Sequence, residues 1–192
     1  MEDSQLKILN ISGKRFKKEL LISSKEVSTL HIFLKGIIND KVMIINTNVG
    51  LDVYYHSSVC YKDLIVNAFL LLTTCSGKSI NDFHIKSLNS RIDIENETNR
   101  FFDRLIKNPL LFKSYTKSLF NQLKINYNDN SELIDELLAL WQTKILETNL
   151  DSNILNTMIP HIITLQDTYF ETFNQPILKS LIKETLKDTR SN

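Results

Sequence analysis

The sequence predicts an α+β protein, in which a small N-terminal domain of mixed strands and helices (residues 1–80) precedes an all-α helical C-terminal half (residues 81–192). All four glycines lie within the first 77 residues, all three prolines follow residue 100, and the second half carries apolar residues at helical spacing. Glycine supplies the positive φ of tight turns, whereas proline is favoured at the first position of a helix. We therefore expect two differently built parts, each with its own core.

The composition is that of a globular protein with enough apolar residues for a core. Of the 192 residues, 42% are hydrophobic and 23% are charged, and the formal net charge is +1. This balance gives no protein-wide field that would attract a polyanion or a membrane surface. The longest apolar run, residues 64–72, is far shorter than the roughly 20 residues of a bilayer span, and the first residues do not resemble a signal peptide. We expect no membrane span and an intracellular location, cytoplasmic or nuclear, with reduced cysteines.

The first two elements are expected to be the strands of a β-hairpin. Residues 6–11 and 16–22 are both rich in apolar residues, and Gly13 between them can adopt the turn.

A helix, two short strands and a second helix are expected next. The serine pair Ser23-Ser24 can cap a helix with an apolar stripe at three- and four-residue spacing. The stripe consists of Val27, Leu30, Phe33, Leu34 and Ile37. Residues 41–46 and 51–56 are short β-rich segments, and we interpret the apolar run at 61–72 as a helix.

The second half is expected to be a bundle of five or six antiparallel helices. One helix spans residues 98–107, Pro109 begins the next, and the polar residues 126–131 form a loop. Asp129 and Glu132 have the spacing of a capping box, which would open a further helix. The last helices are expected at residues 151–173 and 176–187.

The residue types that perform catalysis or bind metals show no joint pattern. The four histidines are scattered singly, and no Gly-x-Ser-x-Gly motif is present. The Gly-Lys-Ser at residues 77–79 lacks the first glycine of a phosphate-binding loop, because Leu72 stands there. We therefore expect no enzyme, no cofactor and no metal. An active site built from distant residues, such as His56 and Cys60 with a carboxylate, would require a cleft that brings them together.

Four basic residues crowd the turn and the second strand of the expected hairpin: Lys14, Arg15, Lys17 and Lys18. A basic hairpin can bind phosphates in a salt-dependent manner. Lysines on a strand edge also discourage aggregation between strands, without any ligand. Binding of nucleic acid or a phosphoinositide is therefore the alternative function.

Residues 9–16 read Leu-Asn-Ile-Ser-Gly-Lys-Arg-Phe, which is similar to the opening strand of the BTB/POZ fold in its potassium-channel tetramerisation variant. Later positions that match the family pattern in order are Ser28, Leu30, Gly36, Val53, Tyr54, Tyr61, Leu64 and Ile65. The resemblance covers residues 5–72 and implies a docking or self-association domain. Residues 6–22 and the helix that follows them also resemble the opening of the ubiquitin-like β-grasp fold, which is the rival resemblance.

The absence of a catalytic pattern and the abundance of apolar stripes predict a non-enzymatic protein-protein interaction or adaptor protein, a subunit of a larger complex. Its partner would be another protein or a second copy of the chain. Aromatic residues of the second half are the candidate interface, with packing in the core as the alternative for each. They are Phe112, Tyr115, Trp141, Tyr169, Phe170 and Phe173.

Overall fold

The structure, a computed structural model, describes residues 4–14, 20–38, 41–73 and 77–147. Its elements are β1 (Gln5–Gly13), α1 (Ser24–Ile38), β2 (Val42–Asn46), β3 (Leu51–Ser57), α2 (Lys62–Thr73), a short 3-10 helix (Ile80–Asp82), β4 (Phe83–Leu88), α3 (Arg91–Ile106) and α4 (Pro109–Glu147).

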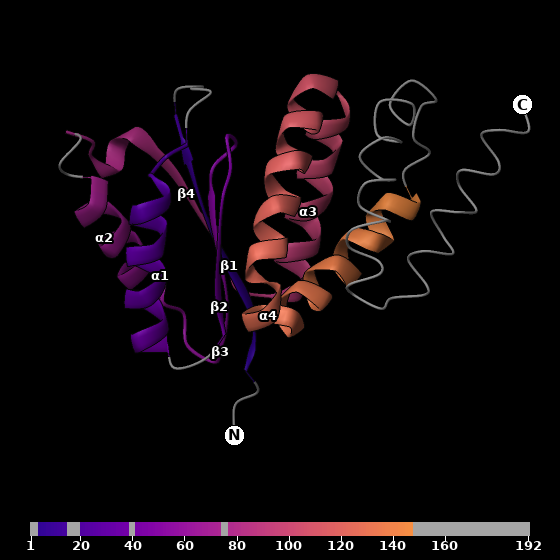
Figure 1. The fold of residues 1–192 in the computed structure, drawn as a ribbon. Coiled ribbons are helices and arrows are strands. Elements are labelled where there is room, and N and C mark those ends of the chain that lie inside the picture. The colour runs from indigo at the N-terminus through magenta and orange to yellow at the C-terminus, as the bar shows by residue number, and fades with distance from the viewer. Residues whose placement is uncertain (1–3, 15–19, 39–40, 74–76, 148–192) are drawn as a thin grey trace, which may run out of the picture.

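The four strands form one antiparallel sheet in the order β2-β3-β1-β4. With α1 after β1 and α2 after β3, this is the split β-α-β topology of ferredoxin-like folds. Helices α1 and α2 cover one face of the sheet, and α3 and α4 cover the other (Figure 1). The molecule therefore has three layers, with the sheet in the middle.

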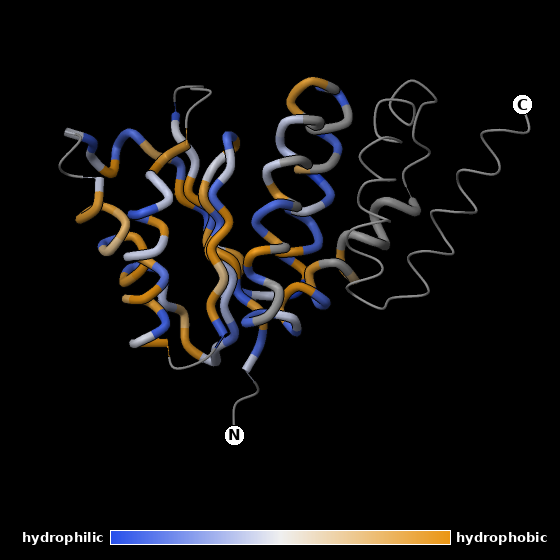
Figure 2. The backbone as a smooth tube through the Cα atoms, viewed as in Figure 1, coloured by the Kyte–Doolittle hydropathy of each residue, from blue (hydrophilic) through white to orange (hydrophobic). Residues whose placement is uncertain are grey.

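Alternating side chains along the strands supply a core on each face. Toward α1 and α2, the sheet contributes residues such as Leu9, Val53 and Ile44. Toward α3 and α4, it contributes Leu6, Ile8, Met43, Ile45, Tyr54 and Leu88. Figure 2 shows the resulting apolar colouring of the strands between the helical layers.

The predicted fold class is wrong. A strand, β4, lies beyond residue 80, in the part expected to be all-helical, and it pairs with β1. Helices α3 and α4 do not pack only on each other, because Ile94, Leu119 and Leu133 share one core with the sheet. The physical reason is that the strands are apolar on both faces, so the second face needs a helical layer of its own.

The predicted β-hairpin is also wrong. Strand β1 has β3 on one edge and β4 on the other, so residues 8–11 have neither edge free for a third strand. Residues 20–23 lie outside any strand. The predictions of a helix after Ser23, of strands near 41–46 and 51–56 and of a helix at 61–72 are confirmed.

In the second half, the helix expected at 98–107 is the end of the longer α3, and the helix start at Pro109 is confirmed. The loop expected at 126–131 is reduced to a kink at one residue, Asn130, whose φ and ψ are non-helical and which joins two helical segments of α4. The helices expected at 151–173 and 176–187 lie outside the described residues.

Candidate functional site

The sheet face toward α3 and α4 changes from apolar to polar along the strands. The strand register places Leu88, Ile8 and Tyr54 in one row across β4, β1 and β3. The next row, two residues along each strand, consists of Lys86, Asn10 and Asp52. Ser12 and His84 form the row after that. The polar rows lie beside the apolar core on the same face of the sheet.

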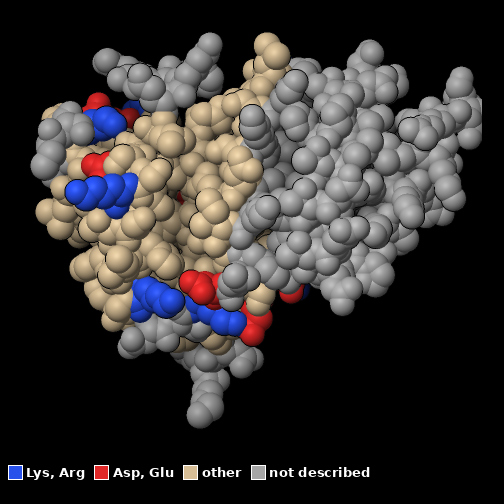
Figure 3. Space-filling view, in the orientation of Figure 1, with Lys and Arg blue, Asp and Glu red and all other residues tan. Residues whose placement is uncertain are grey.

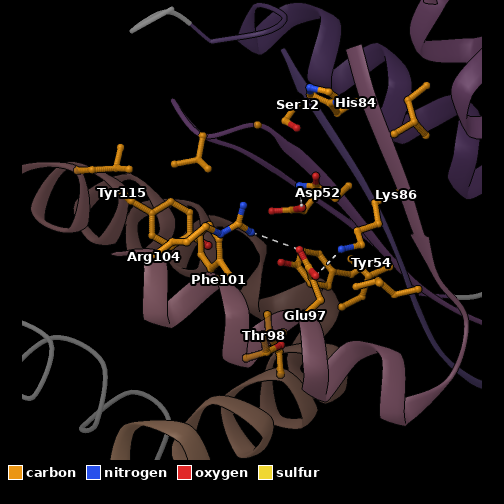
Figure 4. A pocket seen from close by; sticks show the side chains of 18 residues that line it. Ser12, Asp52, Tyr54, His84, Lys86, Glu97, Thr98, Phe101, Arg104 and Tyr115 are labelled. Atoms are coloured by element: carbon orange, nitrogen blue, oxygen red, sulfur yellow. Dashed lines mark hydrogen bonds and ion pairs between the residues drawn. The ribbon is translucent and has the colours of Figure 1, made fainter. Parts of the chain in front are cut away.

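A cavity of about 570 Å³ lies between these rows and the two helices. Its apolar wall includes Ile8, Val49, Leu88, Phe101, Leu111 and Leu137. Its polar groups come from β1, β3, β4 and α3, and include Asp52, Lys86, Glu97 and Arg104 (Figure 4). A volume in this range is typical of sites for small molecules.

Asp52 is the partly buried acid of the cavity. Its Oδ1 accepts a hydrogen bond from Asn10 Nδ2 at 2.6 Å. Burial raises the pKa of Asp52 to about 6 from 3.8, and the hydrogen bond from Asn10 opposes this rise only in part. A neutral amide is the only hydrogen-bonding partner of this carboxylate among the described residues. Its negative charge is therefore incompletely compensated.

Two tyrosines and a phenylalanine form an aromatic wall next to Asp52. Tyr54 and Tyr115 are only 5% and 4% exposed, and both line the cavity. The ring of Phe101 meets that of Tyr115 edge to face, with centroids 4.9 Å apart. Burial, followed by the charge of Asp52, raises the pKa of both tyrosines well above its ordinary value.

A second acid, Glu97, is held by two cations on α3 and β4. Its Oε2 forms an ion pair with Lys86 Nζ, and its Oε1 lies 3.3 Å from Arg104 Nη2. Figure 4 shows Lys86 and Arg104 reaching Glu97 from either side. The Glu97 side chain is 19% exposed, against 68% for Arg104. The basic groups of the cavity are thus tied to Glu97 and leave Asp52 without a cationic partner.

A serine and a histidine also line the cavity. Ser12 and His84 are cross-strand neighbours, and no hydrogen bond joins them in the described structure. In the described part of the chain, no three His, Cys, Asp or Glu side chains gather to hold a metal ion.

The two edges of the sheet differ. The outward-facing backbone of β2 is capped at both ends, because His31 Nε2 lies 2.9 Å from Val42 O and Gln122 bonds both Asn46 N and Asn46 O, at 2.6 and 2.7 Å. At the other edge, Lys14 N donates a hydrogen bond to Asp82 O. Because hydrogen-bonded pairs alternate along an antiparallel pair of strands, the backbone groups of residues 84, 86 and 88 of β4 bond to β1. The backbone groups of Ile85 and Ser87 then point outward, and no described segment pairs with them.

The residues singled out from the sequence are placed as follows. Lys14 is exposed beside the end of β4, whereas Arg15, Lys17 and Lys18 lie outside the described residues. Tyr115 is buried in the core that lines the cavity. Phe112 and Trp141 lie on α4, where their side chains are not described, and Tyr169, Phe170 and Phe173 lie beyond the described part.

His56 and Cys60 do not form a site together. His56 Nε2 lies 2.8 Å from Glu136 Oε2 on α4, whereas Cys60 is an exposed free thiol whose Sγ lies 3.8 Å from Ser87 Oγ.

Sequence reasoning missed Asp52, Tyr54, Lys86 and Glu97 as a group. Each polar residue of the sheet looks like an ordinary outward-facing position of a short strand. Only the register, which joins β1 to both β3 and β4, brings them onto one covered face.

None of the described helices is both long and apolar enough to cross a membrane. Comparisons of the chain with protein-family models, with curated proteins and with solved structures found no match.

Proposed function

We propose that this protein is a non-enzymatic interaction protein that binds an extended segment of a partner protein along the edge of β4. The observation that carries the proposal is the contrast between the edge of β2, which is capped at both ends, and the edge of β4, with which no described segment pairs. An open edge offers a row of backbone donors and acceptors to an incoming strand, which is how β-augmentation works.

The side chains of β4 favour an acidic partner segment. His84 is exposed, and the Lys86 side chain is 45% exposed, on the face toward α3. In a strand added to β4, alternate side chains would lie next to these two residues. Opposite-charge cross-strand pairs stabilise a sheet and like charges destabilise it. A segment with acidic residues at alternate positions, one of which would share Lys86 with Glu97, therefore fits this edge best.

A second copy of the chain fits the edge less well. An antiparallel pairing of two β4 strands centred on Ile85 would place Lys86 of each copy opposite His84 of the other. This arrangement brings basic groups together, so an acidic segment of a different protein is the better partner. On the face in Figure 3, basic and acidic side chains of the described residues lie next to each other, and no large basic patch supports a polyanion as the ligand.

The test uses a proline at an outward-facing position of β4. In Ser87→Pro, the outward N–H that a partner strand would use is lost, while the ladder with β1 is kept, and edge strands tolerate such a proline. Ser87→Ala is the matched control, because it removes the hydroxyl and keeps the N–H. Peptides selected from a displayed random library on the full chain are the probe.

We expect the selected peptides to carry alternating acidic residues, to bind parent and Ser87→Ala protein equally, and to lose at least tenfold in affinity for Ser87→Pro. Amide hydrogen exchange of Ile85 and Ser87 should slow when a peptide binds. The circular dichroism spectrum shows whether Ser87→Pro retains its fold. Peptides that bind Ser87→Pro as tightly as the parent, or a chain that is a stable dimer through β4, would overturn the proposal.

A further inference from the structure

We propose that the cavity between the sheet and helices α3 and α4 binds a small organic cation, an alkylammonium group, with Asp52 as its counter-ion and Tyr54, Phe101 and Tyr115 as its aromatic wall. This site is separate from the β4 edge and does not depend on the partner proposed there.

Asp52 has no cationic partner among the described residues. Its hydrogen bond to the Asn10 amide supplies a donor and no positive charge. The two cations that line the cavity, Lys86 and Arg104, are both bound to Glu97 on α3. Even a partly buried carboxylate without a cationic partner loses hydration, and a ligand that supplies positive charge offsets that cost. A bound ammonium group would compensate Asp52, whereas a bound anion would be repelled by it.

The aromatic rings beside Asp52 can attract a cation. A cation within about 6 Å of the face of Tyr or Phe is attracted by the ring quadrupole, and desolvated sites of this kind recognise ammonium ligands. Tyr54 and Tyr115 are both buried and both interact electrostatically with Asp52, so their rings and the carboxylate lie in one region. Phe101, in contact with Tyr115, extends this wall along α3.

The tyrosine hydroxyls supply acceptors at the wall of the cavity. Tyr54 and Tyr115 are each more than nine-tenths buried, and both line the cavity. Each of these oxygens can accept a hydrogen bond from an ammonium N–H, together with the carboxylate of Asp52.

The lining and volume of the cavity indicate the size and polarity of the rest of the ligand. Apolar residues of the β2–β3 turn and of α4 continue the wall beyond the polar group: Val49, Leu111 and Leu137. About 570 Å³ is enough for an ammonium group with an alkyl or aryl body. Because Glu97 is already paired with two cations, a single positive charge on the ligand is expected rather than two.

A free amine and the side chain of a lysine share this chemistry, and the experiment separates them. Isothermal titration of the full chain with hexylammonium and phenethylammonium tests the free amine. The same titration with Nα-acetyl-lysine-methylamide tests the lysine side chain. Hexanol and hexanoate, of similar size but neutral or negative, are the controls for charge. We expect saturable binding of at least one amine, and at least tenfold weaker binding of the alcohol and the carboxylate.

Variants then locate the site. Asp52→Asn should weaken amine binding at least tenfold, and Tyr115→Phe, which keeps the ring and removes the hydroxyl, should weaken it about threefold. Glu95→Gln changes an acid on α3 that pairs with Arg91 outside the cavity, and it should leave binding unchanged. Equal binding of hexanol and hexylammonium, undiminished binding to folded Asp52→Asn, or no binding of any amine to the folded parent would overturn the proposal. If Asp52→Asn does not fold, the proposal is tested by amine binding to Tyr115→Phe and by the comparison of hexylammonium with hexanol and hexanoate.

Discussion

A single buried carboxylate sets the most specific expectation for the stability of this protein. Burial raises the pKa of Asp52 to about 6 from 3.8, so the folded state holds this proton more tightly than the unfolded state does. The stability of the fold therefore increases as the pH falls from about 6 toward 4, the reverse of the usual carboxylate behaviour. Because Asp52 is partly open to the cavity, the cost of its ionisation at neutral pH is at most about 3 kcal/mol.

Asp52→Asn should therefore stabilise the fold at pH 7 by about 1–3 kcal/mol, since it removes the buried charge and keeps an acceptor for Asn10. The difference between variant and parent should shrink toward zero near pH 4, where the parent carboxyl is protonated. Urea unfolding at a series of pH values measures both quantities. Asp52→Ala should gain less, because it leaves the Asn10 amide without an acceptor. A stabilisation that does not change with pH would contradict this account.

Two glycines should respond in opposite directions to the same substitution. A Cβ on Gly50 would lie 2.6 Å from the backbone oxygen of Ile11, so the β2–β3 turn would have to move away from β1. A Cβ on Gly36 would have no atom within 4 Å, and this position lies in the exposed part of α1. We expect Gly50→Ala to destabilise the fold by about 1–3 kcal/mol and Gly36→Ala to stabilise it by about 0.5–1 kcal/mol. Equal effects in urea unfolding would show that the close approach at Gly50 is not a constraint.

Among the elements, β2 depends on α4 for the cover of its outer edge. Gln122 reproduces with its side-chain amide the two hydrogen bonds that a neighbouring strand would make to Asn46, which is 4% exposed. Gln122→Ala should leave both backbone groups unpaired and destabilise the fold by about 1–3 kcal/mol. It should also open the edge to other strands, with aggregation on heating.

Thermal unfolding followed by light scattering measures these effects, and hydrogen exchange of the Asn46 amide should quicken in Gln122→Ala. Gln122→Glu is the graded control, because its carboxylate can accept from Asn46 N and cannot donate to Asn46 O. Its effect should be intermediate in hydrogen exchange at this amide. An Asn46 amide that exchanges at the parent rate in Gln122→Ala would exclude the capping role.

Elements with strong local signals could be predicted from the sequence. The helix after Ser23 begins with a capping box, in which Glu26 N donates to Ser23 Oγ and the Glu26 carboxylate accepts from Ser23 N. The helix at Pro109 is preceded by Asn108, whose Oδ1 accepts a hydrogen bond from Leu111 N. The polar residues 126–131 predicted a whole loop, but Asn126 Nδ2 donates to Gln122 O within the helix, and only Asn130 has non-helical φ and ψ, at a kink.

Long-range pairing could not be predicted, and for this reason the site was missed. Asn10 and Asp52 are 42 residues apart, and their hydrogen bond exists only because β1 pairs with β3 rather than with the segment that follows it. The sequence of a single strand does not determine which other strand it pairs with. The BTB/POZ and β-grasp resemblances, the adaptor function and the intracellular location remain predictions.

At the scale of the whole molecule, the helices after β4 are expected to be necessary for the sheet to fold. Six apolar side chains on the sheet face toward α3 and α4 are at most 7% exposed: Leu6, Ile8, Met43, Ile45, Tyr54 and Leu88. Burying such a side chain contributes about 1.5–3 kcal/mol. Exposing all six would cost on the order of 10 kcal/mol, which is as large as the stability of a typical domain.

The fragment 1–88 should therefore fail to fold as a monomer, although it contains every strand of the sheet and both helices of the opposite layer. We expect it to lose the near-ultraviolet signal of the full chain and to associate, as circular dichroism and light scattering would show. Replacing three of its exposed apolar residues (Ile8→Thr, Met43→Thr and Ile45→Thr) should reduce the association if this face is the cause. In the full chain, Leu34→Ala on one side of the sheet and Leu119→Ala on the other should lower the midpoint of the same single transition. A native-like, monomeric 1–88 fragment, or two transitions that respond separately to these substitutions, would show instead that the sheet and the helices after it fold independently.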